Sequence, residues 1–487
     1  MRRTIFFSMV VLFVCLPTVA MAFSLVSMQP NYGRFEVFTD EPLVIVFDQS
    51  LDAATVQTTA IAVEDLETGT PVAGATSLGT TTVENDSLVF TPTGGRFPFA
   101  RRLLVDLDGD LRDMTGGEFT GELPHKAVFV ANIPNDLERP DPGTGGFSTD
   151  LFVNSNVLLG FNPLDPESTD PTQTNYIPGL SATEAWKMST GDPEIVIAII
   201  DVGTDTLANE DLADNLYLNK GELPQPRIDT TPCADWDCNG DGRFNARDYE
   251  DDPDVSDYNG NGRYDPEDIV ELLSDGIDND GNGLVDDISG WDFFRNVNTP
   301  LGVNQFPEGC HGKGRACDAA CLANNGRGNK PGVCPNCSIL LVRVGEAIMT
   351  EFNIMTAGVE YAKSLGADVI EVAMGVSNYS SESEQVFIDA YEDGIFTVAA
   401  SGDELGFHHI WPAAGEDVYN LTAIMPLPPV ELFGPIDLSI LAFVQSYCTN
   451  FGAHIESTGV TGACTSEATA NMAGIAGRFN PGRKSKA

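Results

Sequence analysis

Long apolar runs, basic side chains and histidine are all scarce in this sequence of 487 residues. Beyond the N-terminus, no stretch approaches the roughly 20 apolar residues that a membrane span requires, so no membrane span is expected. Lys and Arg number 26 against 72 Asp and Glu, which gives a formal net charge of −46. Nucleic acid and anionic membranes are therefore excluded as partners, because both would be repelled. The five histidines leave few candidates for a proton-exchanging side chain.

The N-terminus has the features of a secretory signal. Arg2 and Arg3 precede the apolar run Ile5–Leu16, and residues 20–22 read Ala-Met-Ala, the small-residue pattern of a cleavage site. We therefore assign residues 1–22 to a signal peptide. The mature protein is expected to be secreted, in an extracellular, periplasmic or cell-surface location.

The cysteine count fits an exported protein. Ten cysteines include Cys15 in the signal, which leaves nine in the mature chain. Cysteines of exported proteins usually pair into disulfides. Because nine is odd, at least one thiol is expected to stay free or to pair with another chain. Cys334 and Cys337 have the spacing of a redox or zinc motif, but neither a second cysteine pair nor a histidine lies at zinc spacing, so a structural role is expected.

Residues 23–132 have the pattern of a small all-β domain. Short apolar runs separated by turn residues lie at 43–47, 60–63, 87–90, 103–106 and 127–130. Such runs predict an antiparallel sandwich. The segment resembles bacterial Ig-like domains, chiefly through Leu43–Phe47 and the later Phe90-Thr-Pro sequence. Residues 133–175, rich in Pro, Asp, Thr, Gly and Asn, are expected to form a linker or wrapping arm.

Residues 176–487 alternate between strand and helix patterns. This alternation predicts an α/β domain with a largely parallel sheet and helices on both faces. Strands are expected at Ile195–Ile200, Ile339–Val344, Val369–Met374 and Ile395–Ala400, and helices at about 354–365 and 382–393. Because ligands bind at the carboxyl ends of parallel strands, we expect Asp201, Gly375 and Asp403 at the functional edge of the sheet.

An acidic insertion, residues 231–290, interrupts this pattern with 18 Asp or Glu against 3 Arg. It contains three loop-like repeats. The first two place oxygen-bearing side chains at positions 1, 3, 5, 9 and 12 of a twelve-residue loop, whereas the third lacks an acid at position 12. The side chains concerned are Asp237, Asn239, Asp241, Asn245 and Asp248 in the first repeat, Asp257, Asn259, Asn261, Asp265 and Asp268 in the second, and Asp278, Asp280, Asn282 and Asp286 in the third.

These repeats predict calcium binding. Ca²⁺ prefers six to eight oxygen ligands, and a glycine at position 6 permits the sharp bend that lets the side chains converge. Gly242, Gly262 and Gly283 hold that position. The first two repeats carry Asp at position 12, as dockerin-like loops do, where an EF-hand usually has Glu. An acidic run is more often a solvated surface, but two tandem matches favour Ca²⁺ as a structural clamp for this self-repelling segment.

Three residues far apart in the sequence predict acyl-transfer chemistry. Asp201 ends the first expected strand, His311 precedes a glycine where a loop enters a helix-like segment, and Ser466 opens a helix-like stretch near the C-terminus. In this order we expect them to act as the orienting acid, the general base and the nucleophile. The other histidines are His125, His408, His409 and His454, and none of them shares the placement of His311.

The segments around these residues resemble the subtilase (subtilisin-like serine peptidase) family. The similar segments are Ile199–Asp205 to the family's Asp motif, His311–Gly314 to its His motif with the second histidine lost, Cys464–Ala470 to its Ser motif, and Ala373, Met374 and Gly375 to the strand that pairs with the substrate backbone. The resemblance spans about residues 176–477. It implies a subtilisin-like fold and the hydrolysis of polypeptide substrates by an Asp-His-Ser triad.

Two departures from the family pattern bear on activity. Asp403 stands where the family usually has an Asn that donates a hydrogen bond to the oxyanion, and an ionised carboxylate would repel that charge. After Gly477 the sequence changes to a basic tail, so the helix that carries Ser466 is expected to be short. We expect a secreted, calcium-stabilised serine endopeptidase. The alternative is a catalytically inactive calcium-binding surface or adhesion protein on the same scaffold.

Overall fold

A computed structural model describes the chain in segments that fall into two compact units, Met1–Val130 and Ala131–Ala487. The described residues are 25–29, 37–40, 42–66, 68–99, 101–107, 111–117, 128–133, 180, 182–302, 311–325, 331–376, 378–407, 410–426, 443–446, 448–452, 455–460 and 464–478. The expected signal peptide, the linker beyond residue 133, and Cys310, His125, His408, His409 and His454 lie outside these residues.

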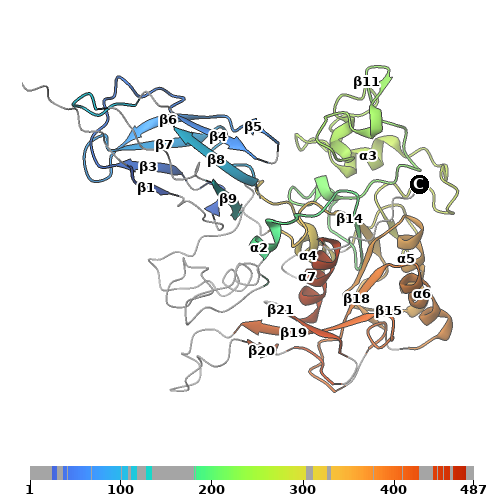
Figure 1. Cartoon of the computed structure of the whole chain (residues 1–487). Coiled ribbons are helices and arrows are strands. Elements are labelled where there is room, and N and C mark those ends of the chain that lie inside the picture. Colours follow the sequence, from blue (N-terminus) through green and yellow to red (C-terminus); the bar gives the residue numbers. More distant parts are fainter. Residues whose placement is uncertain are drawn as a thin grey trace, which may run out of the picture. The chain divides into compact units, whose positions relative to one another are not determined.

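The N-terminal part of the chain consists of strands (Figure 1). They are β1 (Leu25–Gln29), β2 (Val37–Phe38), β3 (Leu43–Phe47), β4 (Ile61–Asp65), β5 (Thr70–Pro71), β6 (Gly74–Gly79), β7 (Ser87–Pro92), β8 (Arg101–Leu107) and β9 (Val128–Ile133). One sheet has the order β1-β3-β7-β6 and the other β2-β9-β8-β4-β5. Side chains alternate strictly between buried and exposed along β4, because one face of the strand covers the core. The all-β expectation is confirmed, and the Ig-like assignment stays a prediction.

The second unit is built on an eight-stranded sheet. Its strands are β10 (Val196–Asp201), β13 (Trp291–Asp292), β14 (Ser338–Arg343), β16 (Val369–Val372), β18 (Phe396–Ala400), β19 (Tyr419–Pro426), β20 (Phe443–Gln445) and β21 (Ser457–Val460). The order is β13-β14-β10-β16-β18-β19-β20, with β21 also paired to β19. All pairings are parallel except that of β19 with β20. The four strands expected from the sequence are β10, β14, β16 and β18, so a largely parallel sheet is confirmed.

Helices cover both faces of this sheet, as expected (Figure 1). They are α2 (Ala182–Trp186), α4 (His311–Ala320), α5 (Phe352–Ser364), α6 (Ser381–Glu392) and α7 (Thr465–Arg478). Ile197 and Ile199 of β10 share one hydrophobic cluster with α4 and α7. Ala198 and Ile200 belong to a second cluster with α5 and α6. Because successive side chains of a strand point to opposite faces, α4 and α7 lie on one side and α5 and α6 on the other.

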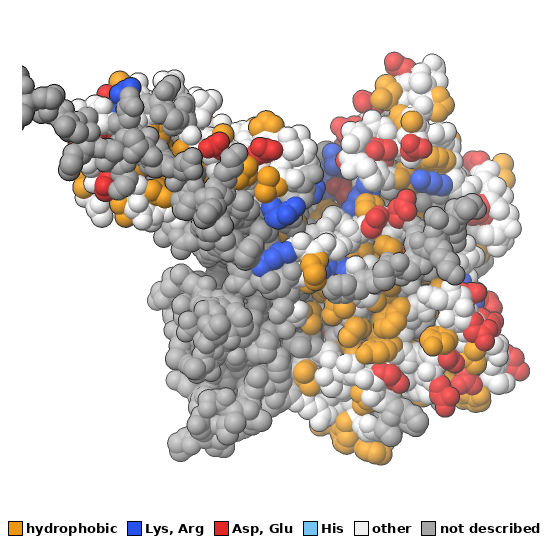
Figure 2. Space-filling view, viewed as in Figure 1, with side chains coloured by type: hydrophobic (Ala, Val, Ile, Leu, Met, Phe, Trp, Pro, Cys, Tyr) orange, Lys and Arg blue, Asp and Glu red, His pale blue; other side chains and the backbone are white. Residues whose placement is uncertain are grey.

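The acidic insertion is packed onto the domain rather than loosely attached. Its elements, with the segment before it, are η1 (Ala213–Asn215), β11 (Arg227–Ile228), β12 (Thr231–Pro232), η2 (Ala234–Trp236), η3 (Ala246–Tyr249) and α3 (Pro266–Leu273). Tyr249 and Ile269 are fully buried in the cluster beneath α4 and α7. Asp265 caps α3 by accepting a hydrogen bond from Glu267 N at 3.0 Å. Acidic side chains dot the surface around α3 and β11 (Figure 2).

Eight cysteines form four disulfides within the described residues. The pairs are Cys233–Cys238, Cys317–Cys321, Cys334–Cys337 and Cys448–Cys464. The ninth mature cysteine, Cys310, lies outside the described residues. The expected structural role of Cys334 and Cys337 therefore takes the form of a disulfide. No helix in the described segments combines the length and the apolar character needed to cross a bilayer.

Candidate active site

Asp201 and His311 are in direct contact. Asp201 is the last residue of β10 and is 1% exposed. His311 is the first residue of α4, and its Nδ1 lies 2.9 Å from both carboxyl oxygens of Asp201. A carboxylate accepts only, so this pairing assigns the imidazole proton to Nδ1 and makes Nε2 the accepting nitrogen of the ring. The arrangement is that of a base held in one tautomer by a buried acid.

Glycine at position 312 allows this approach. A Cβ on Gly312 would lie 2.5 Å from the Gly203 carbonyl oxygen and 3.2 Å from Asp201 Cβ. The first of these distances is closer than a real Cβ tolerates, so any side chain at position 312 would push α4 away from the end of β10. The His-Gly pair noted in the sequence therefore has a packing reason that is independent of chemistry.

Ser466 lies in the first turn of α7, the helix that packs against α4. It is 7% exposed. Thr465, the first residue of α7, contacts Asp403 just beyond the carboxyl end of β18, a strand that runs parallel to β10. Further along, a Cβ on Gly474 would lie 2.8 Å from Ala319 O. The two helices therefore run in the same direction, so Ser466 and His311 both lie at the end of the sheet where β10 terminates.

Asp403 contacts the N-terminus of the Ser466 helix. It follows β18 by three residues, and its Oδ1 accepts hydrogen bonds from Thr465 N at 3.0 Å and Thr465 Oγ at 2.5 Å. A carboxylate at this place satisfies a backbone N–H that the helix cannot satisfy itself, and it complements the positive end of the helix dipole. The residue expected at the oxyanion position is thus adjacent to the candidate nucleophile and holds the turn that presents it.

The segment expected to bind the substrate backbone already has partners. Ala373, Met374 and Gly375 are buried, and Gly375 begins the short strand β17 (Gly375–Val376). This strand pairs in parallel with β15 (Met349–Thr350), and Gly375 N donates to Ile348 O at 2.8 Å. A peptide that pairs with the Gly375 N–H would therefore have to displace the Ile348 carbonyl.

The three acidic repeats adopt the same turn. In each one the first aspartate accepts a hydrogen bond from the glycine at position 6, at 3.0 Å for Asp237, 2.8 Å for Asp257 and 2.9 Å for Asp278. The three glycines have φ of +81°, +83° and +92°, values that favour glycine. A common loop conformation follows, as the repeated spacing predicts.

The acids at position 12 close the first two loops. Asp248 accepts from Cys238 N and Asn245 N, both at 2.9 Å. Asp268 accepts from Tyr258 N at 2.7 Å and from Asp265 N at 2.9 Å. Both carboxylates are buried, and each of their oxygens accepts a hydrogen bond from a backbone N–H. They serve here as loop-closing acceptors, and calcium binding by these two loops stays a prediction.

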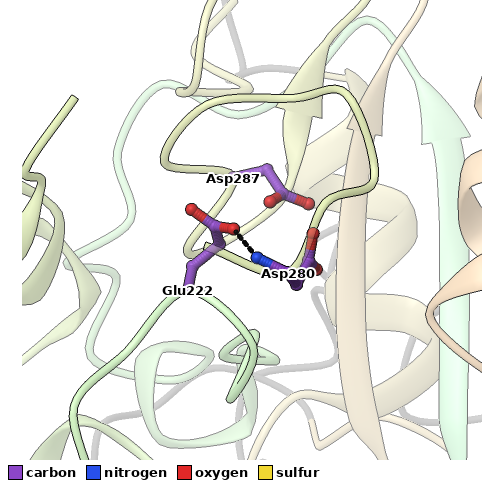
Figure 3. A group of neighbouring side chains, drawn as sticks. All are labelled: Glu222, Asp280 and Asp287. Atoms are coloured by element: carbon purple, nitrogen blue, oxygen red, sulfur yellow. Dashed lines mark hydrogen bonds between the residues drawn. The ribbon is translucent and has the colours of Figure 1, made fainter. Parts of the chain in front are cut away.

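A compact acidic group forms at the third repeat. Glu222, Asp280 and Asp287 bring carboxyl oxygens within 4.8 Å of one another, the one such trio of candidate metal ligands among the described residues (Figure 3). Glu222 Oε1 accepts from Asn279 N at 2.9 Å and from Asp280 N at 3.0 Å, which fixes it against the loop. Asn219 Nδ2 donates to Asp280 Oδ2 at 2.9 Å and to Asp287 Oδ1 at 3.2 Å.

The electrostatics of this trio suit a cation. Burial, reinforced by Asp280 and Glu222, raises the pKa of Asp287 to about 6. Burial also raises the pKa of Glu222, with Asp280 adding to the effect. A bound divalent cation would counteract both causes of these raised pKa values, because it replaces the lost solvation of the carboxylates and neutralises their mutual repulsion. Carboxylate and amide oxygens are the ligands that Ca²⁺ prefers.

Sequence reasoning places Asp287 in the third repeat without assigning it as a ligand, and it misses Glu222. Asp287 directly follows the predicted ligand Asp286 but falls at position 10 of the loop, where the twelve-residue pattern has no ligand. Asp286 instead accepts from Asp275 N at 2.8 Å. Glu222 lies far upstream in an Asn-Lys-Gly-Glu segment that carries no metal motif, so only folding reveals it.

Comparison with known proteins agrees with this geometry. Residues 192–423 match the model described as "Subtilase family", a stretch that includes Asp201, His311 and Asp403 but ends before Ser466. Thermitase of Thermoactinomyces vulgaris is 28% identical over 191 residues, which cover 39% of this chain and 66% of thermitase. "Thermophilic serine proteinase" of Bacillus sp. (strain AK1) is 29% identical over 162 residues, which cover 32% of this chain and 38% of that protein. The matches thus span less than two thirds of both relatives.

Among solved structures, the Prenylagaramide maturation protease PagA matches with a TM-score of 0.35 at 14% identity, covering 61% of this chain and 78% of that one. The fold of the second unit is assigned from the family match, from its parallel sheet and from its helices on both faces. This unit has a subtilisin-like fold.

Proposed function

We propose that this protein is a subtilisin-like serine endopeptidase of the subtilase family, with Ser466 as nucleophile, His311 as general base and Asp201 as the acid that orients the base. The observation that carries the proposal is the contact of His311 Nδ1 with both oxygens of buried Asp201, 2.9 Å each. The parallel packing of the His311 and Ser466 helices and the family match over residues 192–423 support it.

The reaction follows from the protonation state of His311. Ser466 Oγ attacks the peptide carbonyl carbon while its proton passes to His311 Nε2. Collapse of the tetrahedral intermediate breaks the C–N bond, and the leaving amine takes that proton. Water then attacks the acyl group, gives a proton to Nε2, and the acyl–oxygen bond breaks as Ser466 recovers its hydrogen. Asp201 stays ionised and stabilises the imidazolium that forms twice in the cycle.

We infer that the substrates are polypeptides met outside the cytoplasm. The signal-like residues 1–22 direct export, and four disulfides fit an oxidising compartment. A net charge of −46 keeps nucleic acid and anionic lipid away from the surface. The N-terminal β-rich region, as an Ig-like module, would serve as a spacer or adhesion unit.

A peptidase assay tests the proposal. We expect the purified mature protein to hydrolyse unfolded casein in the presence of calcium, and the Ser466→Ala variant to lose this activity while keeping its melting temperature. Retained hydrolysis in Ser466→Ala would reject Ser466 as nucleophile. An intact substrate with both proteins would favour the inactive calcium-binding scaffold instead.

We also infer that Ca²⁺ stabilises the fold through Glu222, Asp280 and Asp287, with the two upstream loops as further sites. When bound, the ion would neutralise the clustered charge of the insertion, which contacts the core through Tyr249 and Ile269. The ion is thus a structural clamp and takes no part in the reaction.

Removal of calcium is expected to lower the melting temperature by several degrees, because an ion that binds only the folded state stabilises it by mass action. Asp287→Asn should reduce that calcium-dependent difference. The matched control is Glu360→Gln on the exposed face of α5, which removes the same charge away from the insertion. Calorimetry with and without EDTA measures all three proteins. A melting temperature that EDTA leaves unchanged in the wild type would reject the clamp.

A further inference from the structure

The end methyl group of Ile410 lies between the segments that follow two neighbouring strands. β16 and β18 pair in parallel, and Gly375 and Gly402 follow their carboxyl ends. A Cβ built on Gly375 would lie 2.4 Å from Ile410 Cδ1, and a Cβ built on Gly402 would lie 3.3 Å from the same atom. The Ile410 side chain therefore fills a gap that exists because both segments have a glycine there.

This gap adjoins the site of the candidate nucleophile. Gly402 directly precedes Asp403, whose Oδ1 accepts a hydrogen bond from Thr465 N at 3.0 Å. Thr465 in turn precedes Ser466 at the start of α7. The contacts from Ile410 to Gly402 and from Asp403 to Thr465 thus place the Ile410 methyl group beside the segment that holds the nucleophile's helix.

A peptide substrate must bring one side chain to this gap. Its attacked carbonyl carbon lies at Ser466 Oγ, and the carbonyl oxygen points to the oxyanion position at Asp403. Its backbone runs along residues 373–375, the segment that the sequence predicts to pair with it. The residue that carries the attacked carbonyl, called the scissile residue below, then has its Cα between the two segments. Its side chain enters the gap that the two glycines leave.

The backbone around Ile410 is fixed by hydrogen bonds. Ile410 O accepts from Ala414 N at 2.9 Å, and Trp411 O accepts from Val376 N at 2.8 Å. The Trp411 ring also packs against the ring of buried Phe352, with the centroids 6.0 Å apart. Isoleucine is branched at Cβ, which restricts rotation about χ1. The Ile410 side chain is therefore a firm wall of the gap.

Met349 also contacts Gly375 but is much less constrained. Its Sδ would lie 3.0 Å from a Cβ built on Gly375, yet Met349 is 42% exposed and its side chain is unbranched. A peptide that pairs with the Gly375 N–H displaces the carbonyl of the preceding residue, Ile348. Met349 therefore moves aside when a substrate binds, whereas Ile410 stays in place.

The wall on the Gly402 side is polar and belongs to the folded framework. Asn450 Nδ2 and Glu404 Oε2 would lie 2.5 and 2.7 Å from a Cβ built on Gly402, and these two groups hydrogen-bond to each other at 2.6 Å. Asn450 is fully buried, and its Nδ2 also donates to Ser401 O at 2.9 Å. Ile410 is thus the apolar boundary of the gap that a substitution can move.

We propose that Ile410 determines which scissile residue the peptidase accepts: by filling the gap between Gly375 and Gly402, it restricts the substrates to polypeptides with glycine or alanine at that position. This inference rests on the proposed function and names its substrate class. A leucine or phenylalanine side chain would overlap Ile410 Cδ1. Because the overlap persists in the transition state, the discrimination appears in kcat/KM.

A variant series at position 410 of the full mature protein tests this inference. Ile410→Val removes Cδ1, the atom that contacts both glycines, and Ile410→Ala removes every side-chain carbon beyond Cβ. The substrates are quenched-fluorescence peptides that differ only in the scissile residue, which is Gly, Ala, Leu or Phe. In the wild type we expect kcat/KM for the Ala peptide to exceed that for the Phe peptide by about 100-fold.

The variants should widen this preference in order of the volume removed. We expect kcat/KM for the Leu peptide to rise about tenfold in Ile410→Val and further in Ile410→Ala, because one methylene in such a pocket is worth at least that factor. The value for the Ala peptide should change little. Ile228→Ala on β11 is the matched control, since Ile228 is exposed and lies outside the gap.

A wild-type protein that cleaves the Phe and Ala peptides equally well would overturn the proposal even if Ile410→Ala does not fold. An unchanged Leu-to-Ala ratio in Ile410→Val would overturn it as well. A fluorophosphonate probe, which modifies an activated serine, separates this inference from the proposed function. Labelled Ser466 without a size preference rejects the role of Ile410 alone. Neither labelling nor hydrolysis rejects the peptidase assignment, and this inference with it.

Discussion

Replacement of Asp201 by asparagine is expected to lower kcat by a factor of about 10⁴ without unfolding the protein. Both Asp201 oxygens lie 2.9 Å from His311 Nδ1. The NH₂ group of an asparagine facing His311 Nδ1 would favour the imidazole tautomer with its proton on Nε2. His311 in this tautomer cannot accept the Ser466 proton. The near-identical shape of the amide preserves the packing at the end of β10. Steady-state kinetics with a quenched peptide measures the loss.

Asp205→Asn is the matched control for this prediction. Asp205 lies four residues further along, is exposed and pairs with Lys313, so the same chemical change there should alter kcat only slightly. Equal losses in both variants would point to a general charge effect. Unchanged kcat in Asp201→Asn would remove Asp201 from the mechanism.

The second large effect concerns Asp403. Asp403→Asn is expected to raise kcat by up to about 100-fold, because a side-chain amide can donate to the oxyanion where a carboxylate repels it, and one such donor is worth 10² to 10³ in rate. The substitution keeps Oδ1 as the acceptor for Thr465 N and Thr465 Oγ, now 3.0 and 2.5 Å away. The anchor of the Ser466 helix is thus preserved while a donor is gained.

Asp403→Ala separates the two roles of this residue. Alanine can neither donate to the oxyanion nor accept from Thr465, so the start of α7 should loosen, with a lower melting temperature and a lower kcat. If Asp403→Asn were slower than the wild type at every pH, the carboxylate itself would be required, and its assignment to the oxyanion position would be wrong.

The fold was predictable where burial alone decides the pattern. Runs of apolar residues at 195–200, 339–344, 369–374 and 395–400 become β10, β14, β16 and β18. When both faces of a strand are buried, every position of the strand favours an apolar side chain. The resulting unbroken apolar run is easy to recognise in the sequence. The Glu371 carboxyl is the exception, an ionisable side chain inside such a run that the sequence gives no reason to single out.

The site was predictable only in part, because its remaining contacts join distant segments. The sequence marks Asp201, His311 and Ser466 through local motifs, but the Asp403–Thr465 contact spans 62 residues. Glu222 reaches Asp280 across 58 residues. Contacts of this kind form only when long loops close around the folded core. The spacing of residues within one short segment therefore does not predict them.

Covalent labelling tests the central claim most directly. A fluorophosphonate probe reacts with a serine hydroxyl only when an adjacent base activates it. We expect the mature protein to be labelled with the adduct on Ser466 by mass spectrometry, and Ser466→Ala and His311→Gln to remain unlabelled. A folded wild-type protein that the probe leaves unmodified, or that carries the adduct on another serine, would contradict the account.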